Sequence, residues 1–183
     1  NNYGDRIKKA WINEDIKYVA NDIELGNEQN GVLLYGINSA GKSSFMKSIG
    51  LSIIMAQSGM FVPCSEMIYY PYNKIYSRIP GGDDIFKGKS SFIVEMSELR
   101  SILKYSDKNS LVLGDEVCKG TEDISALSII TSAVQRFSNK NVKFIFATHM
   151  HKLSLMDEIT GLSNIKLCHL DVDCDDNKIT YSR

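Results

Sequence analysis

The chain has 183 residues, with 21 basic and 22 acidic side chains and a formal net charge of −1. This length suits one domain with a full hydrophobic core. The near balance of charge provides no basic field for gripping nucleic acid, so we expect any DNA contact to lie outside this chain. The first residue is Asn1 rather than methionine, which is typical of a processed product or of a piece cut from a longer protein.

Cysteine spacing and hydropathy indicate the cellular environment of the protein. No two of the four cysteines have C-x-x-C spacing, which disfavours a zinc ribbon and favours a reduced protein: Cys64, Cys118, Cys168 and Cys174. No apolar run approaches the ~18 residues that a membrane span needs, and no signal peptide is visible. We expect an intracellular protein with no membrane partner; these features do not distinguish a nuclear, an organellar or a viral origin.

Strand and helix patterns alternate along the chain. In chain order, they predict a strand at 31–36, a helix at 42–57, an extended stretch at 61–79, a helix at 91–105, a strand at 110–116, a helix at 124–137 and a strand at 142–149. The first helix is expected to bury a face made of Phe45, Ile49 and Ile53. Short apolar strands that alternate with helices predict an α/β fold, with a mostly parallel sheet covered by helices on both faces.

The C-terminal part predicts a peripheral β element. Segments 164–172 and 178–183 are rich in strand-forming residues and flank the turn at 174–177, which favours a hairpin. The aspartates Asp171, Asp173 and Asp175 have the spacing of a calcium loop, but its glycine and glutamate positions hold Asp176 and Ser182, so a solvated turn is preferred. A zinc site is disfavoured as well, because no closely spaced ligand pair occurs among His149, His151, Cys168 and Cys174.

The stretch GINSAGKSS lies between the first predicted strand and the first predicted helix. Its Gly36, Gly41, Lys42 and Ser43 fit the pattern G-x-x-x-x-G-K-[ST]. Glycines let the backbone turn tightly, so that N–H groups point into one concavity, and the helix adds its positive N-terminal end. Lys42 supplies a cation for the β- and γ-phosphates, and Ser43 a hydroxyl for Mg²⁺.

The pattern predicts a P-loop that holds a nucleoside triphosphate. A chance Gly-Lys-Ser turn is the alternative, and the position between strand and helix disfavours it. The whole loop is assigned to the nucleotide: Gly36, Ile37, Asn38, Ser39, Ala40, Gly41, Lys42, Ser43 and Ser44.

Polar residues follow the two later buried strands. Asp115 and Glu116 end the strand LVLGDE, at the sheet edge where the P-loop is expected. Asp115 is predicted to hold Mg²⁺, directly or through water, and Glu116 to activate the attacking water as a base. An acid pair at an ordinary strand end is common, but beside a P-loop it favours nucleotide hydrolysis. His149 ends the strand FIFATH at the same edge, where it could bond the γ-phosphate or the water; a lone histidine is otherwise more often structural, and His151 is expected at the surface.

Four stretches occur in one order with one spacing: GINSAGKSS, DDIFKGKSSFIVEM, LVLGDEVCKGTE and FIFATHMHKL. Together they resemble the ATPase domain of the MutS DNA mismatch-repair family, from about Tyr18 to the end of the chain. FKGKSSF is the most specific stretch, because ordinary P-loop kinases lack it. The resemblance implies a P-loop NTPase of the ABC-like class that hydrolyses ATP to ADP and phosphate with Mg²⁺.

The resemblance also implies roles for single residues. Two such domains sandwich two nucleotides, and Ser90 would touch the γ-phosphate bound by the partner, although it could instead cap the helix that follows. Asn38 matches an asparagine near the γ-phosphate. Tyr18 matches an aromatic residue that stacks on adenine, with a core aromatic as the equal alternative.

Some positions depart from the family pattern. Ile37 replaces a usual proline, and Ala40 replaces a usual glycine, but neither change removes a phosphate-binding side chain. After the acid pair, Cys118 and Glu122 stand where the family commonly has glycine and serine, in a loop normally at the dimer interface. The GDE…GTE pattern is similar to the plant-organellar and giant-virus branch of the family.

The implied function is an ATP-driven DNA-clamp cycle of a mismatch-recognition protein. Its partners would be a second ATPase domain in a dimer, mismatched or damaged DNA bound by domains outside this chain, and downstream repair proteins. Residues 1–183 are expected to form the ATPase domain alone, without mismatch-binding, lever, clamp and C-terminal dimerisation elements. Two alternatives stay open: another ABC-class ATPase of DNA repair or transport, although L-S-G-G-Q is absent, and a nucleotide-gated interaction module with little hydrolysis.

Overall fold

A computed structural model describes most of the chain. The described residues are 20–26, 28–36, 40–79, 91–118, 121–170, 173–175 and 178–180. Their centre is a five-stranded sheet in the order β2-β3-β4-β1-β5, in which every neighbouring pair is parallel. The strands are β1 (Gly31–Tyr35), β2 (Lys74–Arg78), β3 (Ser110–Asp115), β4 (Lys143–Thr148) and β5 (Ile165–His169).

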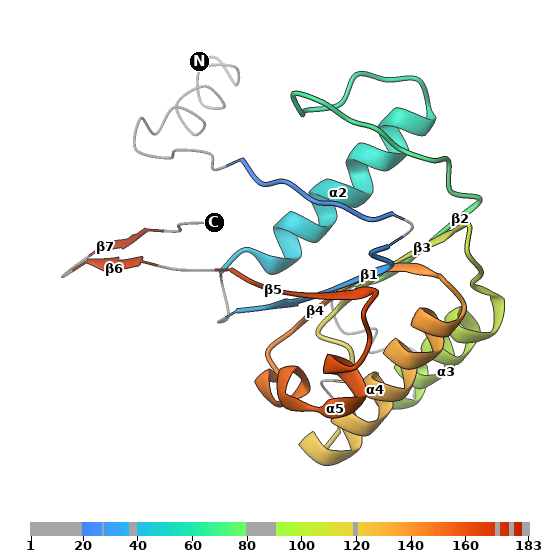
Figure 1. The fold of residues 1–183 in the computed structure, drawn as a ribbon, viewed down its shortest axis with the longest axis vertical. Coiled ribbons are helices and arrows are strands. Elements are labelled where there is room, and N and C mark those ends of the chain that lie inside the picture. Colours follow the sequence, from blue (N-terminus) through green and yellow to red (C-terminus); the bar gives the residue numbers. More distant parts are fainter. Residues whose placement is uncertain are drawn as a thin grey trace, which may run out of the picture.

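Helices cover both faces of this sheet. They are α2 (Lys42–Gln57), α3 (Ser91–Tyr105), α4 (Asp123–Asn139), the 3₁₀ turn η2 (His151–Leu155) and α5 (Asp157–Thr160). Figure 1 shows α2 on one side of the sheet and α3, α4 and α5 on the other. The predicted α/β class and parallel sheet are therefore confirmed. No helix in the described ranges is long and apolar enough to cross a membrane.

The two faces of the sheet build two separate parts of the core. Because side chains alternate along a strand, Leu33 and Phe144 face α3 and α4, whereas Val32 and Ile145 face α2. On the α4 side, the ring of Phe137 lies 5.5 Å from Phe144, so aromatic packing ties α4 to the middle of the sheet. Because all neighbouring strands are parallel, their carboxyl ends lie at one edge of the sheet.

The buried face of α2 differs from the predicted one. Phe45 and Ile49 are only partly buried, and the fully buried positions besides Ile53 are Lys42, Met46 and Gly50. A Cβ at Gly50 would lie 2.6 Å from the Leu113 Cδ1 atom, so the absent side chain lets the helix approach β3 closely. Because the buried face includes a glycine and a lysine, the positions of the apolar residues alone do not identify it.

The predicted C-terminal hairpin was placed wrongly in part. Segment 165–169 is β5, which pairs in parallel with β1 from Gly31↔Ile165 to Tyr35↔His169. The hairpin is smaller, with β6 (Asp173–Asp175) antiparallel to β7 (Lys178–Thr180). As the edge strand of the sheet, β5 exposes Lys166 and His169, so its pattern looks like that of a solvated hairpin.

The stretch 61–79 forms a strand only at its end, in β2. The preceding residues run back along α2 without regular structure. There the Gln57 side chain accepts a hydrogen bond from the Tyr72 N–H at 2.8 Å and donates one to the Tyr72 carbonyl at 3.1 Å. The Gln57 side chain therefore holds this segment against the end of α2, in place of the hydrogen bonds that a sheet would provide.

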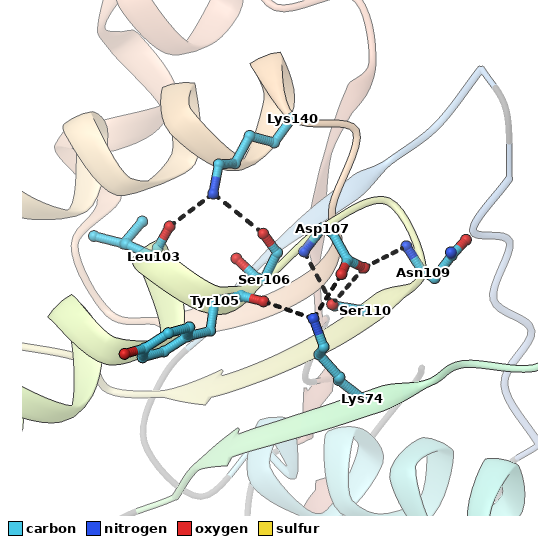
Figure 2. A network of polar contacts seen from close by, with 8 residues as sticks. All are labelled: Lys74, Leu103, Tyr105, Ser106, Asp107, Asn109, Ser110 and Lys140. Carbon is cyan, nitrogen blue, oxygen red and sulfur yellow. Dashed lines mark hydrogen bonds and ion pairs between the residues drawn. The ribbon is translucent and has the colours of Figure 1, made fainter.

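A polar network secures the amino ends of β2 and β3 (Figure 2). The Lys74 Nζ donates to the Tyr105 carbonyl at 3.0 Å and to Asp107 Oδ2 at 2.7 Å. This contact raises the pKa of Lys74 and lowers that of Asp107. The Lys140 Nζ donates to two carbonyls near the end of α3, at 2.9 and 3.1 Å. The network fixes the end of the sheet that lies away from the strands' carboxyl ends.

Candidate nucleotide-binding site

The carboxyl ends of β3, β4 and β1 form one edge of the sheet. Tyr35, the last residue of β1, pairs with Thr148, and Asp115, the last residue of β3, pairs with Ala147. The loops that follow these strands therefore start side by side. These loops carry the predicted P-loop, Glu116 and His149, and Asp115 ends β3 beside them. Open parallel sheets bind ligands at this edge.

The P-loop joins β1 to α2. Its residues 37–39 lie outside the described ranges, and both flanking glycines have positive φ angles, 151° at Gly36 and 91° at Gly41, which favour glycine. The helix begins with the Phe45 N–H donating to the Gly41 carbonyl at 2.9 Å. Within the described part of the chain, α2 has no side-chain cap and no acid in its first turn. Its positive end is therefore suited to an anion.

The Lys42 side chain reaches back from the start of α2 to Gly36, the residue after β1. Its side chain is 5% exposed, and its Nζ donates to the Gly36 carbonyl at 2.6 Å. Burial lowers the pKa of Lys42, while the charges of Glu116 and Asp115 act in the opposite direction. A bound phosphate would add negative charge beside this amine and favour its protonated form.

Asp115 is a buried carboxylate at the end of β3. It is 5% exposed, and its Oδ1 atom has no hydrogen-bond partner among the described atoms. A buried oxygen without a partner is costly unless a ligand completes it. Ser43, partly buried in the first turn of α2, offers a hydroxyl. These oxygens fit Mg²⁺, which commonly takes one or two protein ligands and completes its shell with phosphates and water.

Glu116 leaves the strand in an unusual backbone conformation. Its φ angle is 46°, in the left-handed region, and its N–H donates to the Ala147 carbonyl at 2.9 Å. A residue held in this region costs about 1–3 kcal/mol, and such residues cluster at functional sites. The turn leaves the side chain partly exposed at the sheet edge, beside buried Asp115.

His149 follows β4 and is exposed. The His151 N–H donates to the His149 carbonyl at 3.0 Å, and the Met150 N–H donates to the Thr148 hydroxyl at 3.0 Å, so the turn is held locally. His151 is exposed, as expected, but its ring also stacks on Tyr35 with centroids 6.1 Å apart. Burial raises the pKa of Tyr35 to about 12. Apolar patterning gave no signal for this ring pair, because it depends on the folding of the turn.

The structure brings part of the predicted site together at one edge. This part comprises Gly36, Ala40, Gly41, Lys42, Ser43, Ser44, Asp115, Glu116 and His149. The other predicted site residues lie outside the described ranges: Tyr18, Ile37, Asn38, Ser39 and Ser90. Sequence reasoning did not single out Glu95, a buried acid of α3. Its signal is the spacing i, i+4, i+7 with the buried Leu99 and Ile102, which puts an acid on an apolar face.

The sheet is parallel, and a glycine-flanked loop leads from β1 into a helix that begins with Lys-Ser. These features define the class of P-loop nucleotide-binding domains. The sequence matches the family MutS domain V over residues 32–183. The chain belongs to the MutS family, and it corresponds to the ATPase domain of these DNA mismatch repair proteins.

Three relatives illustrate the similarity. A putative DNA mismatch repair protein mutS homolog of Acanthamoeba polyphaga mimivirus is 48% identical over 173 residues, covering 93% of this chain and 15% of the relative. A mitochondrial mutS homolog of Sarcophyton glaucum is 38% identical, covering 94% and 17%. The DNA mismatch repair protein MutS of Caldicellulosiruptor saccharolyticus is 42% identical, covering 91% and 20%. The chain thus spans a fifth or less of these relatives. The similarity to giant-virus and organellar proteins is in line with the sequence prediction.

Proposed function

We propose that this chain binds ATP at the carboxyl edge of its sheet and hydrolyses it to ADP and phosphate. One observation carries the proposal: buried Lys42, at the start of α2, and the acid pair at the end of β3 lie at the same carboxyl edge of the sheet, where β1 and β3 each pair with β4. A cation for phosphate, a buried carboxylate for a metal and a second carboxylate for water therefore meet at one place. Phosphoryl transfer to water needs these parts.

Each part has one task in the proposed reaction. Lys42 and the N-terminal end of α2 bind the phosphates. Mg²⁺, held by Asp115 and Ser43, would neutralise charge on the β- and γ-phosphate oxygens. Glu116 accepts the proton of the water that attacks the γ-phosphorus, and ADP leaves from the opposite side. His149 is assigned to bond the γ-phosphate or that water, and Asn38 is assigned to the γ-phosphate from the family resemblance alone.

The metal assignment predicts a specific defect in Asp115→Asn. The amide keeps the shape of the side chain but removes the charge that draws Mg²⁺ to the buried Oδ1 position. We expect ATP affinity measured with Mg²⁺ to fall, and ATP affinity measured in EDTA to change little. Isothermal titration under both conditions checks this. If Mg²⁺ raises the ATP affinity of wild type and of Asp115→Asn by the same factor, Asp115 is not a ligand of the metal.

We also propose that two such domains face each other and share their nucleotide sites. The support is the family membership and the stretch FKGKSSF, which runs into the first two residues of α3. In this arrangement Ser90 contacts the γ-phosphate bound by the partner's P-loop, and Tyr18 stacks on adenine. Within a longer protein, the ATP cycle would switch a DNA clamp, with mismatched DNA bound by other domains and repair proteins acting downstream. Residues 1–183 would then form the ATPase unit.

The shared site predicts complementation between two inactive variants. Ser90→Ala and Lys42→Ala should each hydrolyse ATP at least about tenfold more slowly than wild type, because each lacks one half of the site. Mixed together, they form heterodimers in which the Ser90→Ala chain supplies the P-loop and the Lys42→Ala chain supplies Ser90. Phosphate release should then recover toward one working site per mixed dimer.

The competing role for Ser90 gives a different result. A serine that only caps α3 acts within its own chain, and its loss would cost about 1 kcal/mol of stability. Mixing would then restore no activity. Unchanged phosphate release after mixing, with heterodimers demonstrated by cross-linking, would rule out the shared site while leaving a P-loop ATPase.

A further inference from the structure

A buried acid of α3 contacts the loop that carries Glu116. Glu95 is 6% exposed, and its Oε1 accepts a hydrogen bond from the Cys118 N–H at 2.8 Å. Cys118 follows Glu116 by two residues and is itself fully buried. Buried carboxylates are rare in proteins unless they are paired. The hydrogen bond that Glu95 accepts from the Cys118 N–H indicates that Glu95 holds the loop in place.

The loop needs such support because its backbone is strained. Glu116 has φ 46° and Cys118 has φ 68°, so two residues with side chains lie in the left-handed region within three positions. Conformations of this kind persist only where surrounding contacts fix them. On one side of the loop, the Glu116 N–H is bonded to the Ala147 carbonyl at 2.9 Å. On the other side, the Cys118 N–H is bonded to Glu95, so the two bonds bracket the Glu116 side chain.

The charge of Glu95 is balanced by an arginine from β2, the edge strand on the opposite side of the sheet from β5. The Arg78 Nε atom, at the end of β2, lies 3.9 Å from Glu95 Oε1 and 3.1 Å from Glu98 Oε2. Glu98 lies on the same helix, but its side chain is about half exposed, and no described hydrogen bond joins it to the loop. The two acids thus share a cation, and only Glu95 is bonded to the loop.

From these contacts we infer that Glu95 is a positioning residue for ATP hydrolysis, which fixes the loop so that Glu116 is oriented toward the attacking water. This inference rests on the function proposed above. Glu95 lies in the second turn of α3, and this helix begins directly after Ser90, the residue assigned to the partner's nucleotide. The hydrogen bond therefore connects the start of α3 with the hydrolytic loop, so that a shift of this helix changes the geometry at Glu116.

The test compares Glu95→Ala, Glu95→Gln and the control Glu98→Ala in the 183-residue chain. Glu95→Ala removes the acceptor, and we expect kcat to fall by about tenfold or more, since displacements near 1 Å can cost about 100-fold. The Kd for ATP should stay within about threefold, because the P-loop is untouched. Glu95→Gln retains an oxygen for the Cys118 N–H and should keep at least about a third of the wild-type rate. Glu98→Ala should hydrolyse ATP like wild type.

Several outcomes would overturn the inference. They are wild-type kcat in a folded Glu95→Ala protein, parallel losses of ATP affinity and kcat, or equal defects in Glu95→Ala and Glu95→Gln. Hydrogen exchange of the Cys118 amide gives a readout that needs no turnover: it should speed up in Glu95→Ala and not in Glu98→Ala. If wild type releases no phosphate, the proposed function fails, and the exchange result still decides whether Glu95 holds the loop.

Discussion

Lys42→Ala is expected to weaken ATP binding by about 100-fold, because charged hydrogen bonds to phosphate contribute about 1.5–3 kcal/mol and 1.4 kcal/mol is tenfold in affinity. The loop would lose the buried cation that lies beside Asp115 and Glu116 and would leave the acids facing the phosphates. Titration of ATP with heat or fluorescence detection gives the affinity directly. Wild-type affinity in folded Lys42→Ala would refute the P-loop assignment.

The fold should survive this substitution. The Lys42 Nζ contacts the Gly36 carbonyl, a group at the site itself, and burial already disfavours its charge. Lys47→Ala is the matched control, since Lys47 is on the same helix and exposed. Its ATP affinity and unfolding midpoint should equal those of wild type, which separates a local effect at the P-loop from a general loss of positive charge.

Glu116→Gln is expected to separate binding from chemistry. The amide keeps the size and polarity of the side chain but cannot accept the proton of the attacking water, so hydrolysis should fall by about 10²–10⁴-fold. ATP affinity should remain near wild type, because Lys42 and Asp115 are unchanged. Single-turnover phosphate release, measured on protein saturated with ATP, isolates this step.

The matched control for this variant is Glu158→Gln, an exposed acid on α5. It removes the same charge from the molecule at a place away from the acid pair at the end of β3, and it should leave both affinity and rate unchanged. A wild-type rate in Glu116→Gln would mean that another residue activates the water, and the role assigned to Glu116 would then be wrong.

Most of the fold follows from local patterns in the sequence. The helix predicted at 91–105 is α3 with the same bounds, and the three predicted buried strands became β1, β3 and β4. These elements carry their own signals, because buried parallel strands are continuous apolar runs. Segment 165–169 carried a weaker signal, because an edge strand is half solvated, and only the free edge of β1 determines that it joins the sheet.

The candidate site divides in the same way. The P-loop was predicted because its residues are contiguous, and the acid pair because it ends a buried strand. The bond between Glu95 and Cys118 joins residues 23 positions apart, so no local pattern indicates it. Cys118 stands where the family resemblance led us to expect glycine, and its φ of 68° lies in the left-handed region, which a glycine adopts without strain.

The most direct test of ATP hydrolysis by this chain is phosphate release from ATP at rising protein concentration, with Mg²⁺ and with EDTA. We expect specific activity to increase with concentration as paired domains complete each other's sites. Activity should stop in EDTA, and Glu116→Gln should show none of the increase. Tight ATP binding without phosphate release at any concentration would contradict the proposed reaction and indicate a nucleotide-gated interaction module instead.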